Sequence, residues 1–261
     1  MAFTLMLCAH KLNAQDSLRT LEKLAEADPS PFVIVEGSGE ENRSRAQGVV
    51  ISNKGIVLSV GHIAWIEAEK SFTDQFRISF RGTGEGLPAK PSHVHKSVFT
   101  DKEDTNFFEH YFPGKLLKQG DSRFIGKSDL AVFQLPDGKP YPKIDFFSKE
   151  KPTISSGDTL HLCHFNFPHK AGNPSFLMNE VKVVGVAKTS SGLQYLAKGF
   201  YRIGSSGGAL LKDGKLIGIQ SAAYTINTRE NKELPHGLIS FEPVWSDLVT
   251  GALNPKENAS K

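Results

Sequence analysis

Short apolar runs separated by turn residues fill the chain from residue 31 onward. They are rich in Val, Ile, Leu and Phe, and Gly, Pro, Asn or Asp interrupts them: PFVIVEG, GVVISNKGIVLSVGH, QFRISFRG, SDLAVFQLPDG, DTLHLCHF, NEVKVVGVAK, GALLKDGKLIGIQS and HGLISFEPV. Such runs are typical of β-strands, and the turn residues at 53–55 and 212–214 sit where hairpins are expected. The pattern therefore predicts an all-β sandwich or barrel.

Helical spacing is confined to the two ends of this region. Leucines and an alanine recur on one face over 16–27, and DPSP ends the run, which predicts a helix and linker over 15–30. EPVWSDLVTGAL at 242–253 is interpreted as a terminal helix, with a disordered tail at 251–261. Together with the apolar runs, these features predict one β domain over 31–250.

The segment 81–123 is the least regular part of that domain. It is rich in Gly, Pro, Lys and Asp. A long stretch without strand or helix signals inside a compact domain is usually a functional insertion or a disordered excursion. We therefore expect an insertion over about 81–123.

Composition excludes several classes of protein. The 261 residues suit one large domain, and 39% hydrophobic with 23% charged residues is ordinary for a globular protein. A net charge of +3 and scattered basic residues give no reason to expect nucleic-acid binding. The apolar run at 2–9 is too short to span a bilayer, so we expect no membrane span.

That apolar run predicts export. It is followed by HKLNAQDS, in which the small Ala14 suits the end of a signal peptide over 1–14. A basic stretch before it is missing, and a frayed apolar start is the alternative. An exported protein, periplasmic or secreted, would keep Cys163 and lose Cys8, and would form no internal disulfide.

The stretch GSSGG at 204–208 has three interpretations: a flexible linker, a phosphate-binding loop, or a turn that exposes a serine nucleophile. The phosphate loop fails because no Lys or helix follows the glycines. A serine needs a base and a site for the oxyanion before it can act as a nucleophile. The choice therefore depends on the rest of the chain.

His62 and Asp129 are the best candidates to support such a serine. His62 follows two apolar runs at a strand exit, where a side chain can be fixed and still exposed, although a capping or core histidine would look the same. Asp129 opens an apolar run, and a turn aspartate is its plainer interpretation. A carboxylate that orients an imidazole completes a general base.

The other histidines predict no metal site. His93 and His95 share a strand face but have no acidic or cysteine neighbour. A looser cluster is better explained by partly buried strand histidines than by zinc: His161, Cys163, His164 and His169. We expect neither metal nor cofactor.

Three blocks in the order His62, Asp129, Ser206 resemble a known family. GVVISNKGIVLSVGHIAW, KSDLAVFQL and GSSGGALLKDGKLIGIQS are similar to the catalytic blocks of trypsin-like serine proteases, which have the chymotrypsin double β-barrel. The residues of the three blocks are most similar to those of the bacterial HtrA-type branch and its plain trypsin-like relatives. Three ordered blocks are far more specific than one. The chain after Val249 is too short for a PDZ domain, so we expect none.

The resemblance implies a role for each matching residue. His62 would be the general base, Asp129 its orienting carboxylate and Ser206 the nucleophile, with the amides of Gly204 and Ser206 as the oxyanion hole. Three positions depart from the usual family residues, each by a tolerable change: Gly61 for Ala, Ser205 for Asn or Asp, and Ala209 for Pro.

The resemblance also places a substrate pocket. Its lining would come from Phe200 before the serine and from Ser221, Ala222 and Ala223 after it. Phe200 stands where trypsins carry an acid, which argues against cleavage after Lys or Arg and for small or medium apolar side chains.

Taken together, the sequence predicts a serine endopeptidase that acts on polypeptides through an acyl-enzyme intermediate. The alternative is a protease-like binding module that has lost turnover and holds a partner in its cleft or insertion. The presence of all three triad residue types favours the enzyme.

Overall fold

The protein is described here by a computed structural model. It describes residues 19, 21–23, 25–27, 30–66, 68–69, 71–80, 86–94, 129–138, 140–147, 151–167, 174–189, 192–201, 204–224 and 236–244. The predicted signal peptide at 1–14 and the predicted tail at 251–261 lie outside these residues.

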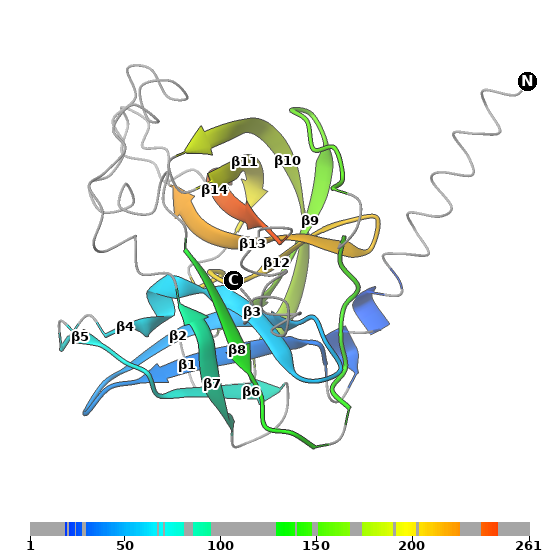
Figure 1. The fold of residues 1–261 in the computed structure, drawn as a ribbon. Helices are drawn as coiled ribbons and strands as arrows, with labels where there is room; N and C mark the ends of the chain where they lie inside the picture. The colour runs from blue at the N-terminus through cyan, green and yellow to red at the C-terminus, as the bar shows by residue number, and fades with distance from the viewer. Residues whose placement is uncertain are drawn as a thin grey trace, which may run out of the picture.

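The first half of the described chain forms a closed antiparallel barrel, drawn in blue to green in Figure 1. Around the barrel the strands follow the order β1-β2-β3-β8-β7-β6. Their bounds are β1 Phe32–Ser38, β2 Arg43–Val50, β3 Ile56–Val60, β6 Phe76–Phe80, β7 Leu87–Val94 and β8 Leu130–Gln134. A one-turn 3-10 helix, η1 (Gly61–Ala64), and a small two-stranded sheet follow β3: β4 Trp65–Ile66 and β5 Ser71–Phe72.

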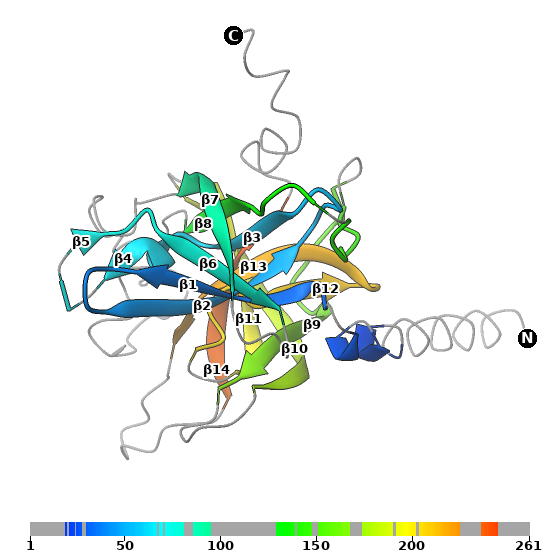
Figure 2. The ribbon, with the colours of Figure 1, turned by 90° about the horizontal axis from the view of Figure 1, so that it is seen from below.

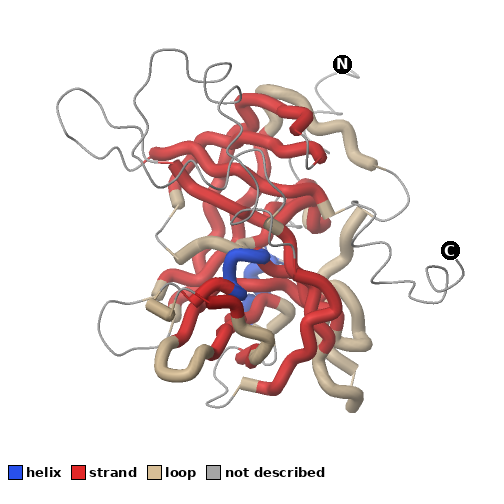
Figure 3. The backbone as a smooth tube through the Cα atoms, turned by 60° about the vertical axis from the view of Figure 1, so that its left-hand side comes forward, coloured by secondary structure: helices blue, strands red, loops and turns tan. Residues whose placement is uncertain are grey.

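The second half forms another closed barrel, above the first in Figure 1. Its strands follow the order β10-β11-β14-β13-β12-β9. Their bounds are β9 Thr159–Asn166, β10 Ser175–Thr189, β11 Gly192–Phe200, β12 Ala209–Lys212, β13 Lys215–Tyr224 and β14 His236–Pro243. Figure 3 shows strands over most of the described backbone and helix only in short stretches. The predicted all-β double barrel is confirmed.

Two predicted hairpin turns are confirmed by their backbone geometry. Gly55, in the turn between β2 and β3, has a φ of 82°. In the turn between β12 and β13, Asp213 and Gly214 have φ values of 51° and 76°. Two consecutive left-handed residues match the twist of a tight antiparallel hairpin, and Asp-Gly is suited to that geometry.

The apolar runs form strands whose side chains fill the interiors of the two barrels. Every residue of β3 is buried, and so is every residue of β8 except Gln134. The N-terminal helix is present at 19, 21–23 and 25–26, with Leu21 and Ala25 buried against the core. Figures 1 and 2 place it on the side of the molecule opposite β4 and β5.

Part of the predicted insertion belongs to the first barrel. β7 lies inside 81–123 and pairs with β6 and β8. The pattern hid this strand because Pro88 and Pro91 interrupt it, and proline removes a backbone donor. The structure accommodates Pro91 at a register shift against β8. Residues 95–123 lie outside the described part of the chain.

The start of the predicted C-terminal helix is also wrong. Glu242 and Pro243 are the last residues of β14, and Glu242 pairs with Ile219 of β13. The N–H of Val244 continues this pairing by donating to the carbonyl of Ile217. Strand pairing outweighs the helical pattern here because it satisfies backbone groups in the barrel wall. Residues from 245 onward lie outside the described part.

Candidate active site

His62 is partly exposed because η1 begins where β3 ends. β3 is wholly buried up to Val60, and the 3-10 turn then buries Gly61, Ile63 and Ala64. Its one outward position is His62, whose side chain is 21% exposed. The turn therefore presents an imidazole at the surface on a backbone that the barrel holds in place.

Asp129 is brought to His62 by strand pairing. It directly precedes β8, and β8 pairs with β3 so that Leu130 lies opposite Val60. His62 Nδ1 lies 2.7 Å from Asp129 Oδ2, and the backbone N–H of His62 donates to Oδ1 over 2.7 Å. A ring nitrogen that donates to a carboxylate carries its proton at Nδ1, which leaves Nε2 as the basic nitrogen.

The second barrel completes the surroundings of Asp129. The hydroxyl of Ser221 on β13 donates to Asp129 Oδ2 over 2.8 Å, and Glu242 Oε1 accepts the backbone N–H of Asp129. The Asp129 side chain has no exposed surface. A buried carboxylate is tolerated only when hydrogen bonds replace its water, and both barrels supply them here.

Ser206 lies on a tight turn between β11 and β12. Gly204 and Gly207 in this turn have φ values of 88° and 84°, and the Gly208 N–H donates to the Ser205 carbonyl over 2.8 Å. A β-carbon at Gly207 would lie 1.9 Å from the carbonyl oxygen of Gln47, so no other residue fits. The glycines are therefore needed to shape the turn and to let it approach β2.

The turn is tied to both barrels. The N–H of Gln47 in β2 donates to the Ser206 carbonyl, and the N–H of Gly207 donates to the Gln220 carbonyl in β13, each over 2.8 Å. The residue after Gln220 is Ser221, which binds Asp129. Adjacent residues of β13 thus connect the serine turn to the His62–Asp129 pair.

The structure brings His62 and Asp129 into direct contact, and hydrogen bonds to β2 and β13 place the Ser206 turn beside the same strands. Among the described residues, the Ser206 hydroxyl makes no hydrogen bond, and the N–H groups of Gly204 and Ser206 donate none. Catalytic hydrogen bonds are often long without substrate. Donors with no protein acceptor are what an oxyanion hole requires.

The predicted pocket residues lie near the ends of β11 and β13, two strands that both pair with β14. Phe200 ends β11 and is half-buried, while Ala222 is 4% exposed and follows a register shift in β13. The hydroxyl of Ser221 is directed to Asp129. Ala223 lies in β13, and its side chain is outside the described part. Their role in substrate binding stays a prediction.

Sequence reasoning missed Gln47 and Glu242. Both are polar residues among the buried positions of their strands, at 2% and 9% exposure. A polar residue within a run that is expected to be buried could have marked them, because a buried polar side chain has hydrogen-bond partners there. Their partners lie in distant segments of the chain, so the sequence could mark these residues but not assign their contacts.

The described members of the histidine cluster are His161, Cys163 and His164. No group of three metal-ligating side chains occurs among the described residues. His161 and His164 are three positions apart in β9, so they face opposite sides of the sheet. His164 Nε2 lies 3.0 Å from the Asn179 amide nitrogen, and burial lowers the pKa of His161. His95 and His169 lie outside the described residues.

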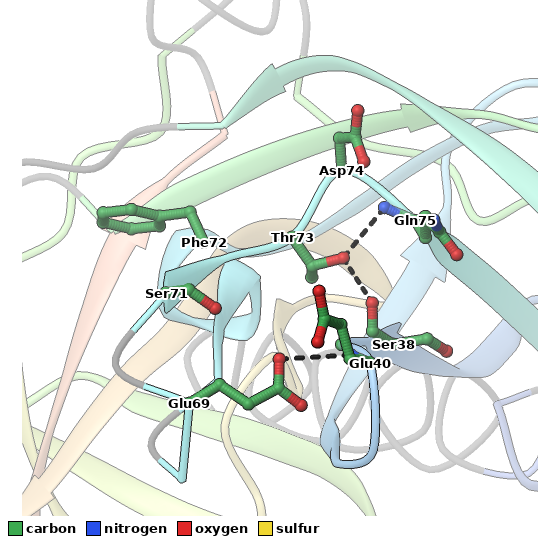
Figure 4. Close-up of a pocket in the computed structure, with 9 residues that line it drawn as sticks. Ser38, Glu40, Glu69, Ser71, Phe72, Thr73, Asp74 and Gln75 are labelled. Carbon is green, nitrogen blue, oxygen red and sulfur yellow. Dashed lines mark hydrogen bonds between the residues drawn. The ribbon is translucent and has the colours of Figure 1, made fainter.

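A separate polar pocket of about 640 Å³ lies on the first barrel (Figure 4). It lies between the β1–β2 turn and the segment 69–75, and none of the predicted site residues lines it. The Glu69 carboxylate accepts the backbone N–H groups of Glu40, Glu41 and Asn42, which lowers its pKa. The acid therefore serves to hold the turn.

No helix in the described part is long and apolar enough to cross a membrane.

Comparison with known proteins supports the fold. No family model and no curated protein matches the sequence. Among solved structures, the chain is similar to a variant of the HtrA-type protease AlgW with a decapeptide, at a TM-score of 0.55 and 14% identity over 92% of this chain and 68% of that one. AlgW with a tripeptide gives 0.54 and 18% over 91% and 63%. The apo MamO protease domain from Magnetospirillum magneticum gives 0.51 and 16% over 87% and 97%.

The two closed barrels and these likenesses agree. At such identities a structural match establishes the fold alone. This chain has the chymotrypsin-like double β-barrel that HtrA-type and trypsin-like proteases share.

Proposed function

We propose that this protein is a serine endopeptidase that hydrolyses peptide bonds in polypeptides. The observation that carries the proposal is the His62–Asp129 pair, a partly exposed imidazole whose Nδ1 lies 2.7 Å from a fully buried carboxylate. Burying a carboxylate costs free energy even when hydrogen bonds replace its water, so packing alone does not explain the buried Asp129 side chain beside His62. The pair suits a general base.

In the proposed reaction, His62 Nε2 removes the proton from the Ser206 hydroxyl as Ser206 attacks the substrate carbonyl carbon. The carbonyl becomes an oxyanion, which the N–H groups of Gly204 and Ser206 stabilise. The protonated His62 then gives its proton to the leaving amine, and an acyl-enzyme remains. Water, activated by the same imidazole, releases the acid and restores Ser206.

Asp129 holds His62 in one orientation through this cycle. Its two oxygens contact the ring and the backbone of the same residue, so the imidazole can neither rotate nor change tautomer easily. It also stabilises the imidazolium once His62 has accepted the proton.

For specificity, we propose a pocket lined by Phe200, Ser221, Ala222 and Ala223 that takes small or medium apolar side chains. Phe200 is half-buried at the end of β11, so this position holds an apolar side chain and not an acidic one that could pair with Lys or Arg. Profiling cleavage sites of the intact protein and of Phe200→Asp tests this. A shift toward Lys or Arg is expected in the variant, and an unchanged profile would overturn the pocket.

The fluorophosphonate reaction tests the function itself. Such a probe labels a serine only when a base and an oxyanion site are assembled around it. We expect labelling of the intact protein and none of Ser206→Ala or His62→Ala, while Ser92→Ala, in β7, labels like the intact protein. Absence of labelling in correctly folded intact protein would favour a protease-like binding module instead.

A further inference from the structure

Gln47 connects the two barrels at the serine turn. It lies in β2 of the first barrel and is 2% exposed. Its side chain nevertheless binds two residues of the second barrel, Phe165 in β9 and Gly204 in the turn. A buried amide that crosses a boundary between barrels fixes their relative position.

The carboxamide of Gln47 uses both of its N–H groups and its oxygen. Oε1 accepts the Phe165 N–H over 2.6 Å, while Nε2 donates to the Phe165 carbonyl over 2.8 Å and to the Gly204 carbonyl over 2.7 Å. This set demands one acceptor and two donors at the end of a long side chain. Glutamate lacks the donors, methionine lacks the donors and the acceptor, and asparagine is one methylene shorter than glutamine.

The backbone of Gln47 binds the same turn. Its N–H donates to the Ser206 carbonyl over 2.8 Å, and its own carbonyl accepts the Ser59 hydroxyl over 2.5 Å. Ser59 lies in β3, three residues before His62. A single residue therefore contacts the turn at Gly204 and Ser206 and also the strand that leads to the imidazole.

We propose that Gln47 is a positioning residue that holds the serine turn, and with it the Gly204 and Ser206 amides, in register with His62. This inference rests on the proposed function. Gly204 has a φ of 88°, and glycine readily leaves such a conformation when its carbonyl is not held. Rotation of the Gly204 backbone would redirect an N–H group of the proposed oxyanion hole. Displacing a catalytic group by about 1 Å can lower a reaction rate by about 10²-fold.

The test is Gln47→Met, which keeps the length and volume but removes all three side-chain hydrogen bonds. Hydrolysis of a peptide ester and inhibition by the matching peptide aldehyde are measured on folded protein, with active sites counted by fluorophosphonate. We expect kcat to fall by about 10²-fold, with KM changed little, because the oxyanion forms only in the transition state. Aldehyde binding should weaken by a similar factor.

Gln134→Met is the matched control. Gln134 Nε2 also donates to two carbonyls, those of Lys54 and Leu135, over 2.6 and 3.0 Å, but outside the site. Its variant should retain kcat. Gln47→Asn, which keeps the amide on a shorter chain, should lose less kcat than Gln47→Met and serves if the latter does not fold.

Each outcome is decisive. A lower kcat with constant KM in the Gln47 variants alone supports the proposal. Unchanged kcat, a rise in KM alone, or an equal loss in Gln134→Met overturns it, as does failure of both Gln47 variants to fold, which would assign Gln47 to the fold. If the intact protein neither labels nor hydrolyses the ester, the proposed function fails first and this inference with it.

Discussion

The hydroxyl of Ser221 donates a hydrogen bond to the buried carboxylate of Asp129 over 2.8 Å. Ser221 belongs to β13 of the second barrel, and Asp129 precedes β8 of the first. The acceptor is Oδ2, the same oxygen that lies 2.7 Å from His62 Nδ1. The orientation of the candidate base therefore depends on contact between two barrels that are far apart in sequence.

Ser221→Ala should weaken both the fold and the reaction. The variant leaves a buried carboxylate oxygen with one fewer donor, and a hydrogen bond to a charged group contributes about 1.5–3 kcal/mol. We expect a loss of this order in unfolding free energy by urea titration, and about a tenfold lower kcat, which corresponds to about 1.4 kcal/mol in the barrier. Ser92→Ala, which removes the bond to the Val132 carbonyl, is the control for a neutral pair. Equal kcat in Ser221→Ala and the intact protein would contradict this role.

Asp129→Asn should abolish most activity while leaving the fold. The amide keeps the shape but presents a donor to His62 Nδ1, which favours the tautomer with the proton on Nε2, the wrong nitrogen for a base. In proteases with this triad such a change lowers kcat by about 10⁴-fold, and we expect that order here. Asp145→Asn is the control, since its side chain is 73% exposed and, among the described residues, pairs with Lys143. Activity of Asp129→Asn within tenfold of the intact protein would rule out Asp129 as the orienting group.

Gly207→Ala should be far more damaging than Gly157→Ala. Both glycines have positive φ, at 84° and 98°, so both variants bear the backbone cost of about 1–2 kcal/mol. Only at Gly207 would the new β-carbon meet another group, the Gln47 carbonyl oxygen at 1.9 Å, whereas nothing lies within 4 Å at Gly157. We expect Gly207→Ala to lose fluorophosphonate labelling and to unfold at lower urea than Gly157→Ala. Similar urea midpoints would show that the turn and β2 are not in contact.

The ion pair between Asp158 and Lys212 should stabilise the protein at neutral pH and lose this effect in strong acid. Lys212 Nζ lies 2.9 Å from Asp158 Oδ2, and this hydrogen bond lowers the pKa of Asp158 from its ordinary value of 3.8. The folded state then binds protons less readily than the unfolded state, so the stabilisation is complete above pH 3.8 and disappears as the pH falls through the folded pKa.

Lys212→Met tests this pH dependence. At pH 7 we expect the variant to be less stable by about 0.2–1 kcal/mol, because the pair is partly exposed. The difference from the intact protein should shrink steadily as the pH is lowered below 3.8. Lys143→Met, whose pair with Asp145 is largely exposed, should change stability less at any pH. A difference between intact protein and Lys212→Met that does not vary with pH would contradict the assignment.

The strands and turns could be predicted from the sequence because their causes are local. A buried strand such as Ile56–Val60 needs apolar side chains throughout, and the Asp213–Gly214 turn needs residues that adopt positive φ. Both requirements are visible in a few neighbouring letters. β7 escaped notice because Pro88 and Pro91 interrupt its pattern, and the register shift that accommodates Pro91 arises against β8, a strand distant in the sequence.

The candidate catalytic groups could be identified from the sequence: a histidine at a strand exit, an aspartate before a strand and a serine between glycines, in an order that resembles a protease family. Tertiary structure alone decided which groups meet. It places Asp129 against His62 through pairing of β3 with β8, and it directs Ser221, Glu242 and Gln47 to the site from other strands. The reason is physical: hydrogen bonds between distant segments depend on how the barrels close and pack, and no local pattern of residues encodes a partner that lies 67 to 157 positions away.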